Sequence, residues 1–154
     1  MIKDSATKEK LLKEWHYVRR SQGILQSRAV ASFGRGGMGM VGVYDEYYGL
    51  LLVLGFSVLE HALRVMAEQG TFKPTRWGLK ALMAASKKAD VQWQDYSAVD
   101  FGRDKRNKLA HEQVIPRAED TFRMLDEVEA ELIGWNILPE RVKCEFSVSI
   151  TRTS

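Results

Sequence analysis

The feature that most constrains this chain is a long apolar stretch near its middle. Residues 43–69 carry large aliphatic or aromatic side chains on every turn of a helix, so no wide polar face is left. A helix that is apolar nearly all round has to be buried on several sides. Its longest uncharged run, residues 47–59, is too short to span a membrane. The sequence therefore predicts a central helix against which other helices pack.

Amphipathic segments on both sides of this stretch predict those other helices. Apolar side chains recur at helical spacing in residues 5–21, 24–33, 76–88, 98–113 and from Pro116 to Gly134. Gly23 is expected to end the first of these helices, which makes 24–33 a short separate one. The expected fold is all-α, an up-and-down bundle of four to five main helices over residues 1–139.

The last residues, 140–154, show a different pattern. Apolar and polar side chains alternate over 142–150, which is typical of a strand. A single strand needs a pairing partner, which could be 38–44 of the same chain, the same strand of a second copy, or another protein. The glycine-rich run 34–42 has no phosphate-loop lysine and no strand before it, so we expect it to be a connector.

Composition excludes several classes of protein. The apolar fraction of 45%, the charged fraction of 28% and the net charge of +3 are ordinary for a soluble domain. Cys144 is the single cysteine and the three histidines share no metal-ligand spacing, so neither a disulfide framework nor a metal or other cofactor is expected. Without a secretory or membrane-spanning pattern, the expected location is the cytoplasm.

The charges are unevenly distributed, which bears on the ligand. The middle third of the chain is rich in basic residues: Lys73, Arg76, Lys80, Lys87, Lys88, Arg103, Lys105, Arg106 and Lys108. One later helix gathers the acidic residues Glu119, Asp120, Asp126, Glu127, Glu129 and Glu131. We expect those glutamates to form a solvated face. A basic side opposite an acidic helix suits a polyanionic ligand, although a solvated charged surface gives the same pattern.

Within helix 98–113, which Ser97 and Asp100 are expected to start as a capping box, Arg106 falls on the apolar arc. A guanidinium there needs an anion, either a carboxylate such as that of Glu60 or a phosphate. Asn107 and His111 lie along the edge of the same arc. Because Arg106 and His111 project about 140° apart on a helix, two copies of the helix are needed to bring both onto one phosphate.

The run Arg106-Asn107-Lys108-Leu109-Ala110-His111 resembles the R-x4-H signature of HEPN domains. These are small helical domains, many of them metal-independent ribonucleases with a cleft at a homodimer interface. The resemblance implies that Arg106 holds the phosphate, that His111 transfers the proton and that Asn107 positions His111 or binds a phosphate oxygen. It also makes Glu60, on the central helix, a further site candidate. Arg103, Lys105 and Lys108 would attract the RNA backbone.

The resulting expectation is a homodimeric endoribonuclease of HEPN type, a toxin or defence effector, in which the RNA 2′-hydroxyl attacks the adjacent phosphate. RNA is the expected substrate, and an antitoxin of nucleotidyltransferase type is a further candidate partner. The alternative is a HEPN-like nucleotide-binding or dimerisation module without catalysis, in which Arg106, Asn107 and His111 form a structural network.

Overall fold

The computed structural model describes residues 2–33 and 45–142, and within these ranges all regular structure is helical. The five helices are α1 (Ser5–Phe33), α2 (Asp45–Glu68), α3 (Leu79–Lys88), α4 (Tyr96–Glu112) and α5 (Ala118–Gly134). The expected all-α bundle is thus confirmed. The glycine-rich run 34–42, segment 38–44 and, apart from Val142, the expected strand 142–150 lie outside the described residues.

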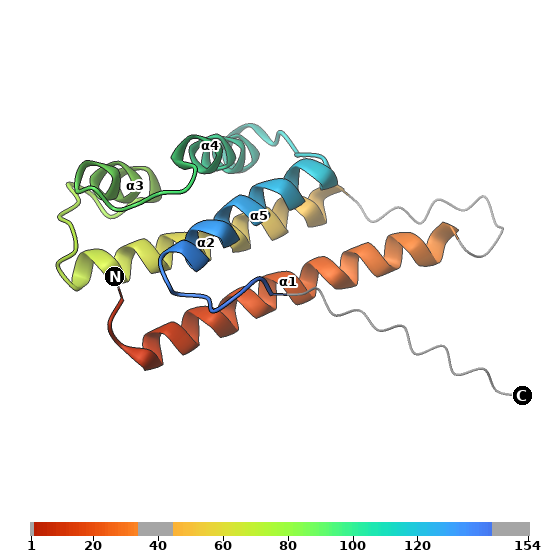
Figure 1. Ribbon diagram of the computed structural model, residues 1–154. Coiled ribbons are helices and arrows are strands. Elements are labelled where there is room, and N and C mark those ends of the chain that lie inside the picture. The colour runs from red at the N-terminus through yellow and green to blue at the C-terminus, as the bar shows by residue number, and fades with distance from the viewer. Residues whose placement is uncertain (1, 34–44, 143–154) are drawn as a thin grey trace, which may run out of the picture.

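The helices form three layers around α2. Helix α1 lies on one side, α2 and α5 run alongside each other in the middle, and α3 and α4 cross over them on the opposite side (Figure 1). Helix α2 contacts all four other helices. The up-and-down alternation holds between α1 and α2, whereas α3 and α4 cross the middle layer steeply instead of continuing it (Figure 1).

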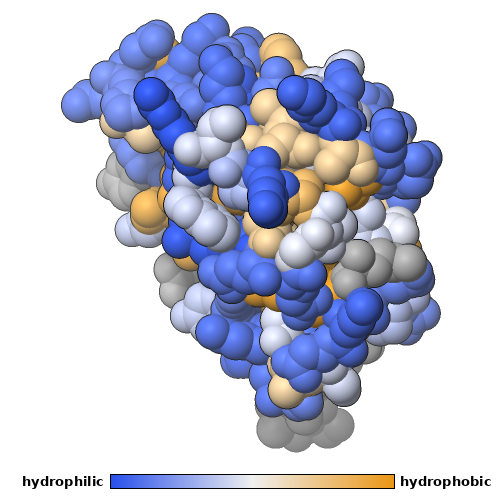
Figure 2. Space-filling view, turned by 90° about the vertical axis from the view of Figure 1, so that its left-hand side faces the viewer, coloured by the Kyte–Doolittle hydropathy of each residue, from blue (hydrophilic) through white to orange (hydrophobic). Residues whose placement is uncertain are grey.

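Helix α2 is the central helix that the sequence predicts. Leu52, Phe56, Leu59 and Leu63 have no exposed surface. Residues Glu46–Glu68 are long and apolar enough to cross a membrane by length and composition, but 61% of their most apolar window is buried inside the bundle. Figure 2 shows that one end of the molecule is mostly hydrophilic, with a confined apolar area. This arrangement is compatible with a soluble protein whose core helix is α2.

Helix α1 is one continuous helix, so the expected break at Gly23 is wrong. Gly23 lies buried inside the helix. A glycine in a helix costs only about 1 kcal/mol relative to alanine. The packing of Leu11, Trp15 and Val18 against α2 and the rest of the core outweighs that cost. The segment 24–33 therefore continues α1 rather than forming a separate helix.

The acidic face of α5 is partly buried, contrary to the expectation of a solvated face. Glu129 is 2% exposed. Its Oε1 accepts hydrogen bonds from Trp15 Nε1 at 2.7 Å and from Arg19 Nε at 3.2 Å. Its Oε2 accepts a hydrogen bond from Arg19 Nη2 at 2.6 Å. Arg19 also bonds Asp126 at 2.6 Å. Burial by itself would lower the pKa of Arg19, but its two carboxylate partners outweigh burial and raise it.

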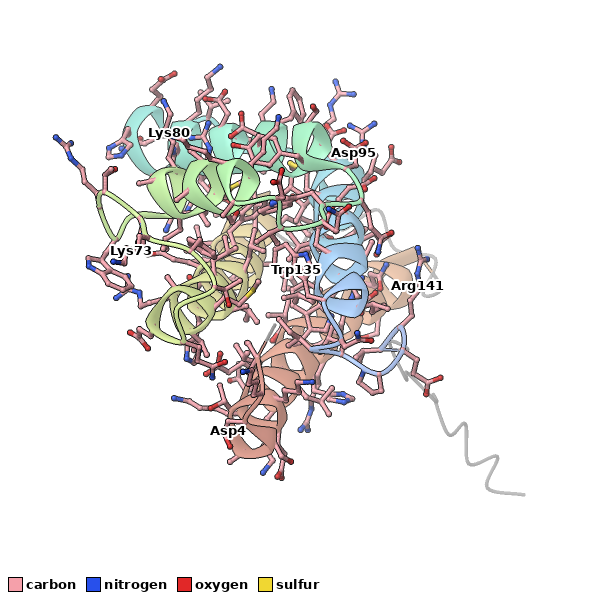
Figure 3. All side chains as sticks on the ribbon, turned by 60° about the vertical axis from the view of Figure 1, so that its left-hand side comes forward. Asp4, Lys73, Lys80, Asp95, Trp135 and Arg141 are labelled. Carbon is pink, nitrogen blue, oxygen red and sulfur yellow. The ribbon has the colours of Figure 1, made fainter. Side chains whose placement is uncertain are left out.

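The second buried acid of α5, Glu131, holds the connection between α3 and α4. Its carboxylate accepts the backbone amides of Gln94 at 2.9 Å and Asp95 at 2.7 Å. Trp135 lies at the end of α5, and its indole donates to the carbonyl of Gln92 at 2.8 Å. Figure 3 shows Asp95 at the start of α4 and Trp135 near the end of α5. These bonds fix the point where α4 begins.

Aromatic side chains pack this connection onto the core. The ring of Trp93 meets those of Tyr96 and Trp135 edge to face, with centroids 5.2 and 4.8 Å apart. Trp93 and Tyr96 thus pack against the protein. The helix expected over 76–88 begins only at Leu79, which leaves Trp77 in the preceding turn, where it is 49% exposed.

The start of α4 differs from the expected capping box. The cap is Asp95, whose Oδ1 accepts the amide of Ala98 at 2.9 Å. Ser97 lies inside the helix, and Asp100 bonds Arg103 instead of the helix end. Because an aspartate two residues earlier caps the amide of Ala98, the helix starts at Tyr96 rather than at residue 98.

Candidate functional site

Two glycines set the position of the motif helix over α2. A Cβ atom on Gly102 of α4 would come within 2.6 Å of the ring of Phe56, and one on Gly49 of α2 would come within 2.8 Å of Leu109. At Gly102 the absence of a side chain makes room for the Phe56 ring, and at Gly49 it makes room for the flexible end of Leu109. These two contacts hold the face of α4 that contains Gly102 and Leu109 against α2, and so fix where the neighbouring Arg106 lies.

Arg106 is partly buried and poorly satisfied. Its Nε atom is inaccessible to solvent and has no hydrogen-bond partner among the described residues. Within the described part of the chain its guanidinium makes one hydrogen bond, from Nη1 to Oδ1 of Asn107 at 3.3 Å, which is long for a charged donor. No carboxylate within the described ranges pairs with Arg106. The geometry therefore leaves a charge that an external anion would satisfy.

His111 lies one residue before the end of α4 and is exposed. The helix stops at Glu112 because Gln113 takes the left-handed conformation, with φ of 55°. Val114, Ile115 and Pro116 then lead into α5. Since Arg106 is partly buried and His111 open to solvent, the two side chains leave α4 in different directions, as their spacing predicts.

The other basic residues of α4 are placed differently from one another. The side chain of Arg103 is 8% exposed and its Nε is 2.7 Å from Oδ1 of Asp100, so its charge is neutralised inside the fold. Lys108 is 3.2 Å from Asp104 in a surface pair. The Lys105 ammonium lies 5.0 Å from the ring centroid of Phe101. Lys105 and Lys108 are accordingly the accessible cations of this helix, whereas Arg103 is a structural one.

Glu60 is not brought to the motif. Its Oε1 is 3.1 Å from Nη2 of Arg64, one turn further along α2. The pairing of Glu60 with Arg106 that the sequence suggested is therefore not observed, and Glu60 is instead one member of an ion pair within α2. Glu60 and Arg64 line an open pocket towards α1, next to a second pair in which His61 Nδ1 is 2.8 Å from Glu14. Among the described residues no group of three or more His, Cys, Asp or Glu side chains is placed to hold a metal ion.

A groove between α4 and α5 lies beside the motif. Its volume is about 200 Å³. It is lined by Phe101, Lys105, Val114, Ile115, Pro116, Arg117, Asp120 and Met124. The motif alone did not predict this groove. The signal present in the sequence was the pair of apolar residues Val114 and Ile115, which follow the helix directly and are 48% and 38% exposed.

Comparisons with protein-family models, with curated proteins and with solved structures find no match. An exposed imidazole can accept or donate a proton near neutral pH, and a guanidinium without a carboxylate can bind a phosphate. The second half of α4 thus carries an exposed imidazole and a guanidinium without a carboxylate partner among the described residues, separated by about one and a half turns of helix.

Proposed function

We propose that this protein is a cytoplasmic, homodimeric endoribonuclease of HEPN type, acting as a toxin or defence effector on RNA. The observation that carries the proposal is the state of Arg106. Its guanidinium is partly buried, its Nε has no partner in the described part of the chain, and an exposed His111 lies five residues further along the same helix. The resemblance of this run to the HEPN signature supplies the reaction class.

The charge of Arg106 supports a phosphate ligand over a purely structural role. Desolvating a guanidinium without a carboxylate partner is costly, and a structural arginine in this position normally has its pair inside the fold. Arg19 and Arg103 are such structural arginines here, since each bonds a carboxylate at 2.7 Å or less. Arg106 differs from both because its partner is the neutral amide of Asn107.

The proposed reaction is cleavage by the RNA itself. Neutral His111 accepts the proton of a 2′-hydroxyl, the 2′-oxygen forms a bond to phosphorus, and the bond from phosphorus to the 5′-oxygen breaks. The imidazolium returns its proton to the departing 5′-oxygen. The products are a 2′,3′-cyclic phosphate and a 5′-hydroxyl, so no net proton is released. Arg106 neutralises the phosphate oxygens as their charge increases in the transition state.

The site is completed by a second subunit. On one α4, Arg106 and His111 diverge by about 140°, too far to act on the same phosphate. Pairing two copies of α4 about a two-fold axis places His111 of one subunit against Arg106 of the other. Asn107 then either orients the imidazole or contacts a phosphate oxygen. An antitoxin of nucleotidyltransferase type is a candidate partner that would cover this cleft.

Cleavage of a labelled single-stranded RNA in EDTA tests the proposal. The wild-type protein should generate fragments ending in a cyclic phosphate and beginning with a 5′-hydroxyl, and His111→Ala should abolish cleavage. The matched control is His16→Ala, which removes an exposed histidine of α1 and should leave the rate unchanged. Both variants should keep the wild-type melting temperature to within a few degrees. Cleavage by His111→Ala at the wild-type rate would refute the assignment.

A second candidate function is a HEPN-like nucleotide-binding or dimerisation module without catalysis. Three of the four lysines and arginines of α4 already have a partner within the helix: Arg103 with Asp100, Lys108 with Asp104, and Lys105 over Phe101. This favours a helix whose polar residues serve its own structure. In that case His111→Ala would lower the proportion of dimer measured by sedimentation, and the wild-type protein would not cleave RNA.

A further inference from the structure

The groove between α4 and α5 combines an aromatic ring, aliphatic walls and cations. Phe101 is 51% exposed at one wall, and Val114 and Ile115 form the other side. Exposed aromatic and aliphatic side chains that meet in one concavity are an apolar surface that water covers unfavourably. Ligand pockets for whole drug-sized molecules measure roughly 300–1,000 Å³. At about 200 Å³ this groove fits a smaller, planar group.

The rim of the groove is positively charged. Neither Lys105 nor Arg117 has an ion-pair partner among the described residues. Of the described residues that line the groove, Asp120 is the one acid, and it lies 3.2 Å from Arg123, which offsets its charge. The ammonium of Lys105 lies over the Phe101 ring at 5.0 Å. An exposed cation–π contact of this kind is weak, so Lys105 can exchange it for a phosphate oxygen.

We propose that this groove is a nucleotide subsite, in which Phe101 stacks on one base of single-stranded RNA and Lys105 and Arg117 bind the adjacent phosphate. The inference rests on the proposed function and names the part of the substrate that lies away from the scissile bond. Stacking on an aromatic side chain together with a cationic rim is the usual way in which proteins hold single strands without reading their sequence. An apolar side chain of another protein would leave Lys105 and Arg117 unpaired.

The groove is placed to hold a strand whose neighbouring linkage reaches His111. Lys105 and His111 are six residues apart, which corresponds to about 9 Å along the helix axis. Lys108 projects between them, and its surface pair with Asp104 is of the kind that contributes little and is easily exchanged. Arg106 projects on the other side of α4. The RNA strand therefore runs from the groove past Lys108 to His111 of the same subunit. Arg106 of this subunit then contacts the strand that is bound to the partner subunit.

Binding of a short 2′-O-methyl RNA oligonucleotide tests the subsite without cleavage, because this oligonucleotide has no free 2′-hydroxyl. Fluorescence anisotropy with the full-length protein should show a Kd about 5-fold or more weaker for Phe101→Leu, the lower end of the range for loss of one stacked base. Lys105→Gln should reduce the slope of log K against log salt by about 0.7. Tyr17→Leu, which removes an exposed ring of α1, should bind as wild type does. The same oligonucleotide without bases should bind wild type and Phe101→Leu equally.

Each other outcome overturns the inference. Equal affinity of Phe101→Leu and wild type, or equal affinity for oligonucleotides with and without bases, rules out stacking on Phe101. A change of oligomeric state in Phe101→Leu assigns the groove to a protein partner instead. Failure of the proposed function gives a different result. If the oligonucleotide binds through Phe101 but the protein cleaves no RNA, the nucleotide subsite stands and the ribonuclease activity is refuted.

Discussion

Replacing Glu129 with alanine should destabilise the bundle more than loss of any exposed acid of α5. The carboxylate of Glu129 is 2% exposed and accepts bonds from two buried groups, the indole of Trp15 and the guanidinium of Arg19. It also accepts the amide of Val142 at 3.1 Å, where the described part of the chain ends. Alanine at this position would remove the acceptor of the Trp15 indole and of the Val142 amide, and one of the two carboxylates that Arg19 bonds.

The expected loss follows from the burial of the pair. Removing one member of a buried ion pair costs about 3–5 kcal/mol, because the other charge stays buried. Arg19 keeps its bond to Asp126, whose side chain is 49% exposed, so the loss should fall near the lower limit, about 3 kcal/mol. In a chain of this length each kcal/mol lowers the Tm by about 2–4 °C, so Glu129→Ala should melt about 6–12 °C below wild type.

Chemical denaturation followed by circular dichroism measures this loss. Asp126→Ala is the matched control, because its carboxylate is half exposed, and it should lose about 1 kcal/mol or less. The double variant Arg19→Met with Glu129→Leu replaces both charges by apolar groups and should lose less than the sum of the single variants, by about 1–3 kcal/mol. Strictly additive losses, or a Glu129→Ala protein as stable as wild type, would refute the reasoning.

Three further changes test other parts of the fold. Gly102→Ala should lose about 1–3 kcal/mol in denaturation, because its Cβ would lie 2.6 Å from a core aromatic ring; Gly134→Ala, which meets an exposed flexible side chain, should lose about 1 kcal/mol or less. Asp95→Ala should lower the free energy of unfolding by about 1 kcal/mol through loss of the cap of α4, whereas Ser97→Ala should not change it measurably. A larger loss for Ser97→Ala than for Asp95→Ala would show that Ser97 is the cap. Burial raises the pKa of Glu131 above its ordinary 4.5, so the folded state binds the proton of this carboxyl group more tightly than the unfolded state does. The stability that proton binding contributes is therefore lost as the pH rises. Relative to wild type, Glu131→Gln should therefore be more stable at about pH 7 than at about pH 4; a pH-independent difference in Tm would contradict this.

The central helix and its neighbours could be predicted from the sequence because hydrophobic periodicity determines which segments are helical. Residues 43–69 were expected as one buried helix, and α2 covers Asp45–Glu68. The helix ends were less predictable. Gly23 and Ser97 carry local signals for a helix end and a helix start, but the cost or gain of each is about 1 kcal/mol. Tertiary packing of α1 and the nearby Asp95 override signals of that size.

The buried polar contacts of α5 could not be predicted from periodicity. Glu129 and Glu131 look like members of a solvated face until Arg19 and the amides before α4 are placed next to them. Their partners are 110 and 36–37 residues away in sequence, and a single sequence contains no information on such pairs. Glu60 is a different case, because its partner Arg64 is only four residues away on α2 and the i,i+4 spacing of the two residues was already visible in the sequence.

The candidate site was foreseen as a set of residues but not as a surface. The motif identified Arg106, Asn107 and His111 on one helix, and the helical spacing predicted their divergence. It did not predict that Arg103 would be neutralised inside the fold, or that Phe101 would line a groove. Both depend on how α4 rests on α2 and α5, which is set by the close approach at Gly102.

Complementation between two inactive variants tests the shared site most directly. Arg106→Ala keeps His111, and His111→Ala keeps Arg106, so a mixed dimer contains one complete site if the two groups come from different subunits. Co-expression of the two variants should restore about a quarter of the wild-type rate of RNA cleavage, since random pairing makes about half of the dimers mixed and each has one complete site of two. A mixture as inactive as its components would contradict a site built from two subunits.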